Sequence, residues 1–116
     1  MYIDGFVAPT PNANKEKYRE FAVLAAQVFK ENGALSVVDA WGDDVPDGKL
    51  TSLPMAVKLA PGETVTFGWI CWPDKATRDA GMAAAMTDPR LNNEGDIMPF
   101  DGKRMIFGGF TLINQA

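Results

Sequence analysis

The alternation of apolar and polar positions along the chain predicts four strands and two helices, in the order strand, helix, strand, strand, helix, strand. We expect strands at residues 2–8, 35–41, 63–72 and 104–112, and helices from about residue 14 to residue 32 and over residues 75–87. This order is typical of the ferredoxin-like βαββαβ arrangement, in which two helices back a four-stranded antiparallel sheet. The predicted fold class is therefore α+β.

The ends of the helices carry recognisable signals. Asn12 or Asn14 is expected to cap the first helix, and Gly33 to end it. Asp74 is expected to cap the second helix. The residues expected on the inner face of this second helix are Ala76, Ala80, Met82, Ala83 and Met86.

The stretch from residue 49 to residue 60 is ambiguous. Ser52 and Pro54 suit a helix start, which favours a short helical turn, but the following apolar residues are also compatible with a sheet edge. With 116 residues in total, the chain is long enough for one domain with a real core, so we treat residues 1–116 as a single domain.

Both faces of two predicted strands are apolar. In residues 63–72, Phe67 and Trp69 lie on one face while Ile70 and Trp72 lie on the other, and residues 104–112 show the same pattern. Two helices cover only one face of a four-stranded sheet, so a second molecule is needed to cover the other. The pattern therefore predicts a homodimer in which the sheet of one chain covers that of the other.

Three segments of the chain resemble one known family. MYIDGF at residues 1–6, GDDVPDGK at 42–49 and MPFDGKRMIFGGF at 98–110 are similar to the uncharacterised family called domain of unknown function 1428, in the dimeric α+β barrel superfamily. The resemblance runs almost from end to end and implies a homodimer whose two sheets close into a barrel. It implies no catalytic residues, because none is established for that family.

Charge and hydropathy narrow the range of partners. The formal net charge is −4, and the eleven Lys and Arg residues are scattered, so we expect neither nucleic acid nor an anionic membrane as a partner. No segment approaches the roughly 18 apolar residues of a membrane span, and the first residues lack the features of a signal peptide. We expect a cytoplasmic protein.

The chain contains no histidine and one cysteine, Cys71. This removes the usual ligands of zinc and haem and the commonest general base at neutral pH. The acidic segment at residues 43–48 does not fit a calcium loop, because Val45 falls where the third ligand is required. We therefore expect no cofactor and no metal site.

The candidate pocket combines residues of the second and third strands with residues of the turn that leads into the last strand. Its members are Asp39, Trp41, Trp69, Met98, Phe100, Asp101, Lys103 and Arg104. The three tryptophans of the chain also suit a hydrophobic core, and the Asp101–Gly102 step also suits a simple turn. Arg104 is expected to pair with Asp101 or Asp39.

Three functions remain open at this point. The first is the binding of a small apolar or aromatic metabolite. The second is a cofactor-independent mono-oxygenase or isomerase, in which Asp39 or Asp4 is the base and Arg104 or Lys103 holds an oxyanion. The alternative for either aspartate is that it faces solvent or pairs with Arg78, Lys103 or Arg104. The third function is a structural or partner-binding dimer, so the sequence leaves enzymatic activity undecided.

Overall fold

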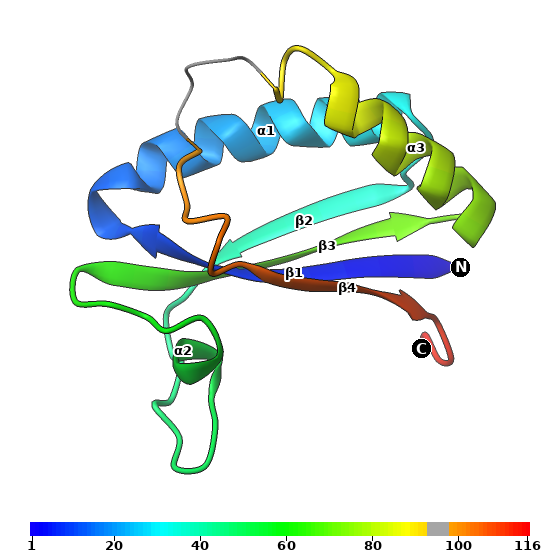
Figure 1. Ribbon diagram of the computed structural model, residues 1–116. Coiled ribbons are helices and arrows are strands. Elements are labelled where there is room, and N and C mark those ends of the chain that lie inside the picture. Colours follow the sequence, from blue (N-terminus) through cyan, green and yellow to red (C-terminus); the bar gives the residue numbers. More distant parts are fainter. Residues whose placement is uncertain (93–97) are drawn as a thin grey trace.

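Two helices cover one face of a four-stranded antiparallel sheet (Figure 1). The computed structural model describes residues 1–92 and 98–116. The elements are β1 (Tyr2–Pro11), the 3-10 turn η1 (Asn12–Asn14), α1 (Lys15–Glu31), β2 (Ser36–Trp41), α2 (Leu53–Ala56), β3 (Glu63–Trp72), α3 (Lys75–Thr87) and β4 (Ile106–Thr111). The predicted α+β fold with βαββαβ order is confirmed.

The strand order is β2-β3-β1-β4, so the first and third strands form the centre of the sheet. β1 pairs with β3 along its whole length, from Tyr2 opposite Trp72 to Pro11 opposite Glu63. Side chains alternate between the two faces of a strand, so this register puts every second residue of β1 under the helices. The long central pairing therefore fixes which residues the helices can contact.

β1 is longer than the predicted strand at residues 2–8. It continues through Pro9 and Pro11, although proline cannot donate a hydrogen bond within a sheet. The reason is that β4 pairs only with Tyr2–Val7, so the last residues of β1 have a strand neighbour on one side alone. Proline is tolerated at such an edge. The boundaries of β2 and β4 differ from the prediction by one or two residues.

Most of the predicted helix signals are present. Gly33 follows α1 with φ of 107°, and the side chain of Asp74 accepts a hydrogen bond from the Thr77 amide at 2.7 Å. The predicted cap of α1 is wrong, because neither asparagine side chain bonds to the helix start. Asn14 donates instead to the carbonyl of Pro99, and Asn12 accepts from the Thr64 hydroxyl. Each of these hydrogen bonds links the start of α1 to a segment that is distant in the sequence.

The short helical turn favoured within residues 49–60 is confirmed as α2. The side chain of Ser52 accepts a hydrogen bond from the Met55 amide at 3.1 Å, and Pro54 lies in the first turn. The segment from residue 42 to residue 62 lies below the sheet, on the side away from α1 and α3 (Figure 1). Val57 from this segment packs against Val7 and Val65 of the sheet. One end of the lower face is thus covered by the chain itself.

The inner face of α3 differs from the prediction. Gly81 and Ala85 are buried, whereas Ala76, Ala80 and Ala83 are exposed, so most of the expected inner face was wrong. The ring of Trp72 is fully buried and lies against Gly81, which leaves no room there for a larger side chain. The small residue that permits close approach to Trp72 is therefore a glycine, and Ala76, Ala80 and Ala83 face outward.

Within residues 1–92 and 98–116, no helix is both long enough and apolar enough to cross a membrane. The longest helix, α1, has an exposed polar face and a buried face that carries Tyr18, Ala25 and Val28. Its apolar residues pack on the sheet, as the helical spacing predicted.

Replacing Gly81 with alanine should destabilise the protein. A Cβ atom at this position would lie 2.5 Å from the Trp72 ring and 2.6 Å from the Asn32 carbonyl oxygen. We expect a loss of about 1–3 kcal/mol in the free energy of unfolding, although alanine is the better helix former. Urea unfolding of the variant and the wild type measures this loss. Gly102→Ala is the control, because nothing lies within 4 Å of a Cβ there, and an equal effect of both changes would contradict the packing argument.

Candidate functional site

A cavity of about 360 Å³ lies between the helices and the sheet. Its walls come from α1, α3, the upper face of the sheet and the segment that leads into β4. The lining is mostly aromatic or aliphatic and includes Phe6, Phe21, Phe29, Ile70, Met82, Met86, Met98, Phe100, Met105 and Phe107. A hollow of this size with few polar groups is typical of a site for a small organic molecule.

Phe100 connects α1 to the segment before β4. Its ring packs edge-on against Tyr18 and Phe21, with centroid distances of 6.1 and 5.9 Å. Edge-to-face contacts of this kind add to the stabilisation that comes from buried apolar area alone. The amide of Asp101, the next residue, donates to the carbonyl of Pro9 in β1. The wall of the cavity on this side is therefore attached to both a helix and the sheet.

The first polar pair in the lining is Tyr18 with Asp39. The Tyr18 hydroxyl donates to Asp39 Oδ1 at 3.2 Å, and the tyrosine side chain is buried. Desolvation of its carboxylate beside α1 raises the pKa of Asp39 above its ordinary value, although the residue as a whole is exposed, and the Tyr18 hydrogen bond opposes this shift. Burial and the nearby carboxylate also raise the pKa of Tyr18. This pair presents a carboxylate to the cavity.

The second polar pair is Asp4 with Arg78. Asp4 lies in the middle of the sheet and is only 8% exposed. Arg78 Nη2 lies 2.7 Å from Asp4 Oδ1, and Arg78 Nε lies 3.1 Å from both carboxylate oxygens. The indole of Trp72 donates to Asp4 Oδ2 at 3.0 Å. The buried carboxylate is therefore well satisfied, and the guanidinium also lies over the ring of Tyr2.

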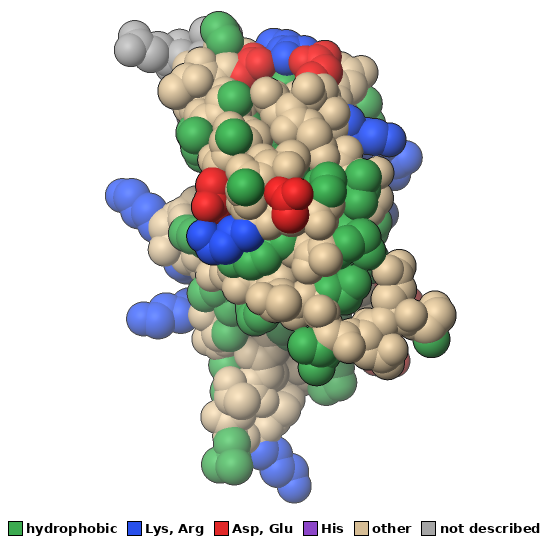
Figure 2. All heavy atoms as spheres, turned by 90° about the vertical axis from the view of Figure 1, so that its right-hand side faces the viewer, with side chains coloured by type: hydrophobic (Ala, Val, Ile, Leu, Met, Phe, Trp, Pro, Cys, Tyr) green, Lys and Arg blue, Asp and Glu red, His purple; other side chains and the backbone are tan. Residues whose placement is uncertain are grey.

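Further charges surround Arg78 at the start of α3. Arg78 Nη1 donates to Asp79 at 3.0 Å, and Asp79 also accepts from Lys75. On this end of the molecule, acidic and basic side chains lie beside one another, and neither kind forms a continuous patch (Figure 2). The positive charge of Arg78 is thus offset by two neighbouring carboxylates.

A more open groove of about 430 Å³ runs between α1 and β2. It shares Tyr18, Ala22, Val37 and Asp39 with the cavity, so these residues separate the two hollows. Trp41 lines the groove, and Lys15 Nζ lies 5.5 Å from the centre of its ring. Asp39 is therefore accessible from both the cavity and the groove.

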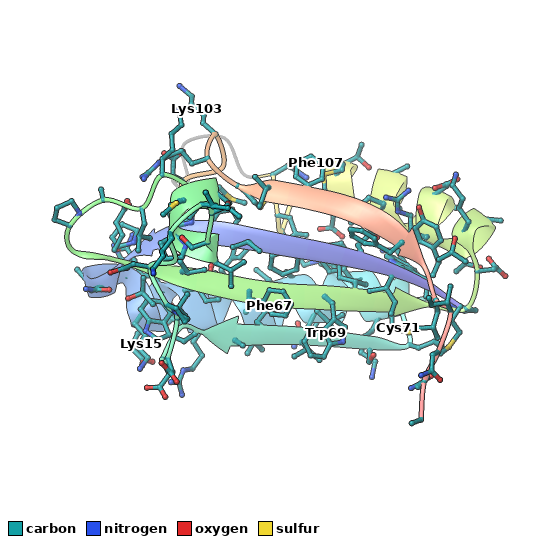
Figure 3. All side chains as sticks on the ribbon, turned by 90° about the horizontal axis from the view of Figure 1, so that it is seen from below. Lys15, Phe67, Trp69, Cys71, Lys103 and Phe107 are labelled. Carbon is teal, nitrogen blue, oxygen red and sulfur yellow. The ribbon has the colours of Figure 1, made fainter. Side chains whose placement is uncertain are left out.

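The structure divides the predicted pocket residues among several places. Asp39, Met98 and Phe100 line the cavity, and Trp41 lines the groove beside it. Trp69 lies on the opposite face of the sheet, where its ring packs against Phe67 at 5.8 Å (Figure 3). The strand pattern had put Phe67 and Trp69 on one face without deciding which face of the sheet the helices cover.

Asp101, Lys103 and Arg104 surround the turn before β4 and are not part of either lining. Arg104 Nε donates to Asp101 at 2.7 Å, which confirms one of the two expected pairings. Arg104 also binds both carboxylate oxygens of Glu63 at the start of β3, a partner that the sequence analysis missed. Lys103 projects outward at the rim of the sheet (Figure 3). Through its bonds to Asp101 and Glu63, Arg104 therefore links the turn before β4 to β3.

Several residues of the cavity were not predicted as site residues. Phe6 of β1, Tyr18 of α1 and Arg78 of α3 all line it. The available signal was that Asp4 is a charged residue in an apolar strand, which indicates a buried cationic partner. The sequence does not indicate which arginine pairs with Asp4, because that depends on the register of β1 against β3 and on the position of α3.

The described residues contain no group of three or more His, Cys, Asp or Glu side chains that could hold a metal ion. The two carboxylates that line the cavity, Asp4 and Asp39, already accept hydrogen bonds from Arg78 and Tyr18. The arrangement can therefore bind an organic molecule through apolar contact, with one carboxylate and one guanidinium as polar contacts.

Removing the Arg104 side chain should weaken the protein at neutral pH. Arg104 holds the pKa values of Glu63 and Asp101 below their ordinary values, chiefly through its hydrogen bonds. Carboxylates with depressed folded pKa values stabilise the fold above their unfolded pKa values, and this contribution is lost as pH falls through the folded values. Arg104→Ala should thus lower the urea midpoint at pH 7 and have little effect in acid.

Lys103→Ala is the control for this measurement, because the lysine lies beside Arg104 and is exposed. It should leave the midpoint nearly unchanged at both pH values. Equal midpoints for Arg104→Ala and wild type throughout the pH range would show that the arginine does not fasten the turn.

Comparison with known proteins identifies relatives along almost the whole chain. The model of a family described as a protein of unknown function (DUF1428) matches residues 1–102. The chain is 54% identical to the uncharacterized protein YbaA of Escherichia coli strain K12 over 112 residues, which cover 97% of this chain and 96% of that protein. The YbaA protein of Shigella flexneri shows the same identity and coverage. The chain therefore belongs to the DUF1428 family.

Proposed function

We propose that the protein binds a small apolar or aromatic molecule in the cavity between its helices and its sheet. The observation that carries this proposal is the cavity itself, about 360 Å³ in volume and lined mainly by aromatic and methionine side chains. Burying an apolar ligand there removes its surface from water, and each buried CH₂ group contributes about 0.8 kcal/mol. The methionines adapt to the shape of an occupant because their side chains are unbranched and flexible.

Two polar side chains in the lining favour a ligand that is not purely apolar. Asp39 and Arg78 contact the cavity from different elements, and both are held in place by neighbours. A few fixed polar groups in an apolar pocket orient a ligand and provide specificity. These groups support binding of a molecule that carries at least one polar substituent.

Filling the cavity should prevent binding. Ala25 lines the cavity only, whereas its neighbour Ala26 lines the groove only, so these two positions on α1 form a matched pair. Ala25→Leu should weaken the binding of small aromatic probes at least tenfold, and Ala26→Leu should leave it nearly unchanged. Isothermal titration with indole and 4-ethylphenol measures both, and circular dichroism checks folding.

Native mass spectrometry of protein purified without denaturation complements this test by detecting a molecule that copurifies with the chain. Absence of any bound molecule, together with no probe binding to the wild type, would overturn the proposal. The protein would then be better explained as a structural or partner-binding dimer.

A second candidate function is a cofactor-independent mono-oxygenase or isomerase, favoured by one observation. Asp39 lines the cavity, and desolvation raises the pKa of its carboxyl group, which is the direction that favours a general base. Arg104 does not fit the oxyanion role considered from the sequence, because it is engaged by Glu63 and Asp101 outside the cavity. Arg78 is the cation that lines it.

An enzyme of this kind should lose turnover when Asp39 is changed to asparagine. Wild-type rates should rise with pH through the pKa of the carboxylate, while Asp39→Asn should be inactive but still bind the substrate. Unchanged turnover in the variant would exclude Asp39 as the base.

We also propose that two copies associate through the lower face of the sheet. Phe67, Trp69 and Cys71 lie along β3 on the side away from the helices (Figure 3). Phe67 and Phe110 are 42% and 61% exposed, and Ile106 on β4 is also exposed. The segment from residue 42 to residue 62 covers only part of this face. An exposed aromatic surface of this kind supports a protein–protein interface.

Placing a charge on this surface should separate the two copies. Phe67→Asp would bury an unpaired carboxylate at the interface, and light scattering should then show a single chain of 12.6 kDa where the wild type shows twice that mass. Val23→Asp is the control, because Val23 is exposed on α1, on the other side of the molecule. A monomeric wild type at micromolar concentration would overturn the proposal.

A further inference from the structure

The polar groups of the cavity do not lie together but at two separate positions. In the register of the sheet, Asp4, Ile70 and Val37 form one row, and Phe6, Gly68 and Asp39 form the next row on the same face. Asp39 is thus two strands and two residues away from Asp4, which binds Arg78. Ordinary strand geometry puts the Cα atoms of Asp4 and Asp39 about 12 Å apart.

The floor between these two positions is aromatic. Gly68 has no side chain, and the Phe6 ring occupies the space above it, with Cζ only 2.3 Å from where a Cβ atom would be. Phe21 and Phe29 of α1 line the same cavity. A flat ring between Asp39 and Arg78 would therefore contact aromatic side chains, a favourable arrangement for an aromatic ligand.

We propose that the ligand is a neutral aromatic compound with a hydroxyl group at one end and a carbonyl group at the other. The hydroxyl binds Asp39, and the carbonyl oxygen binds Arg78. This inference rests on the proposed binding function and specifies the chemical class of the ligand.

The hydroxyl belongs at Asp39 because an ionised carboxylate only accepts hydrogen bonds. Tyr18 donates to Oδ1, and among the described residues no hydrogen bond reaches Oδ2. That oxygen is available for a donor from the ligand. The Tyr18 O–H is already engaged as a hydrogen-bond donor to Asp39, so the pair as a whole presents an acceptor.

The carbonyl belongs at Arg78 because a guanidinium only donates. Nε and Nη2 donate to Asp4 and Nη1 donates to Asp79, which uses three of the five N–H groups in the hydrogen bonds found among the described residues. One N–H on each of Nη1 and Nη2 remains. Asp4 and Asp79 offset the charge of the arginine and would repel a carboxylate, so a neutral carbonyl oxygen fits better than an anion.

Four related probes test this assignment by isothermal titration. 4-Hydroxyacetophenone has both groups, 4-methoxyacetophenone lacks the donor, 4-ethylphenol lacks the carbonyl, and 4-hydroxybenzoate has a carboxylate in its place. The wild type should bind the first roughly tenfold more tightly than each of the others. The second and third probes each lose a hydrogen bond and leave a protein group without a partner, and the carboxylate of the fourth is repelled by Asp4 and Asp79.

Variants then assign each preference to its residue. Asp39→Ala should remove the preference for hydroxyl over methoxy and keep the preference for the carbonyl. Arg78→Ala alone would leave Asp4 buried without its partner, so the double variant Asp4→Asn with Arg78→Met, which leaves no N–H donor in the side chain at position 78, is used to remove the carbonyl preference. Asp43→Ala, an exposed position after β2, is the control and should behave as the wild type.

Each outcome has a defined meaning. Equal affinities for all four probes would overturn the assigned ligand class and leave the binding function standing, as would tighter binding of 4-hydroxybenzoate. Preferences that persist in the variants would also overturn it. No binding of any probe to the wild type would overturn both this inference and the proposed function.

Discussion

The ion pair between Asp4 and Arg78 is the interaction on which much of the structure depends. A carboxylate in the middle of a sheet is costly unless it is fully hydrogen-bonded, and here Arg78 and the Trp72 indole provide that bonding. The contact joins the central strands to α3, while Trp72 packs against Gly81 of the same helix. The position of α3 over the sheet, and with it one end of the cavity, follows from satisfying this one buried charge.

The two faces of the sheet have different surroundings. The upper face carries the cavity, where Phe6, Ile70 and Phe107 meet residues of both helices. The lower face is partly covered by the segment around Val57 and otherwise exposes Phe67 and its neighbours. Both faces of β3 are apolar because one lines the cavity beneath the helices and the other packs against Val57 at one end and carries Phe67 and Trp69 beyond it.

The sequence predicted the elements far better than the site. The order of strands and helices, the exact span of β3 and α3, and the Asp74 cap could be predicted because they depend on local periodicity and hydrogen bonding. The residues of the predicted pocket do not lie together, because Trp69 and Asp39 belong to opposite faces of the sheet. A strand pattern gives two faces but does not indicate which one the helices cover.

By itself, the sequence determined the α+β class, the family and the small number of chemistries open to a chain without histidine. Only the tertiary structure decided that Arg78 binds Asp4, that Arg104 fastens a turn to Glu63, and that Tyr18 meets Asp39. Each of these pairs joins residues at least 21 positions apart. Such pairings depend on strand register and helix placement, which arise from the packing of the whole chain and not from any local pattern.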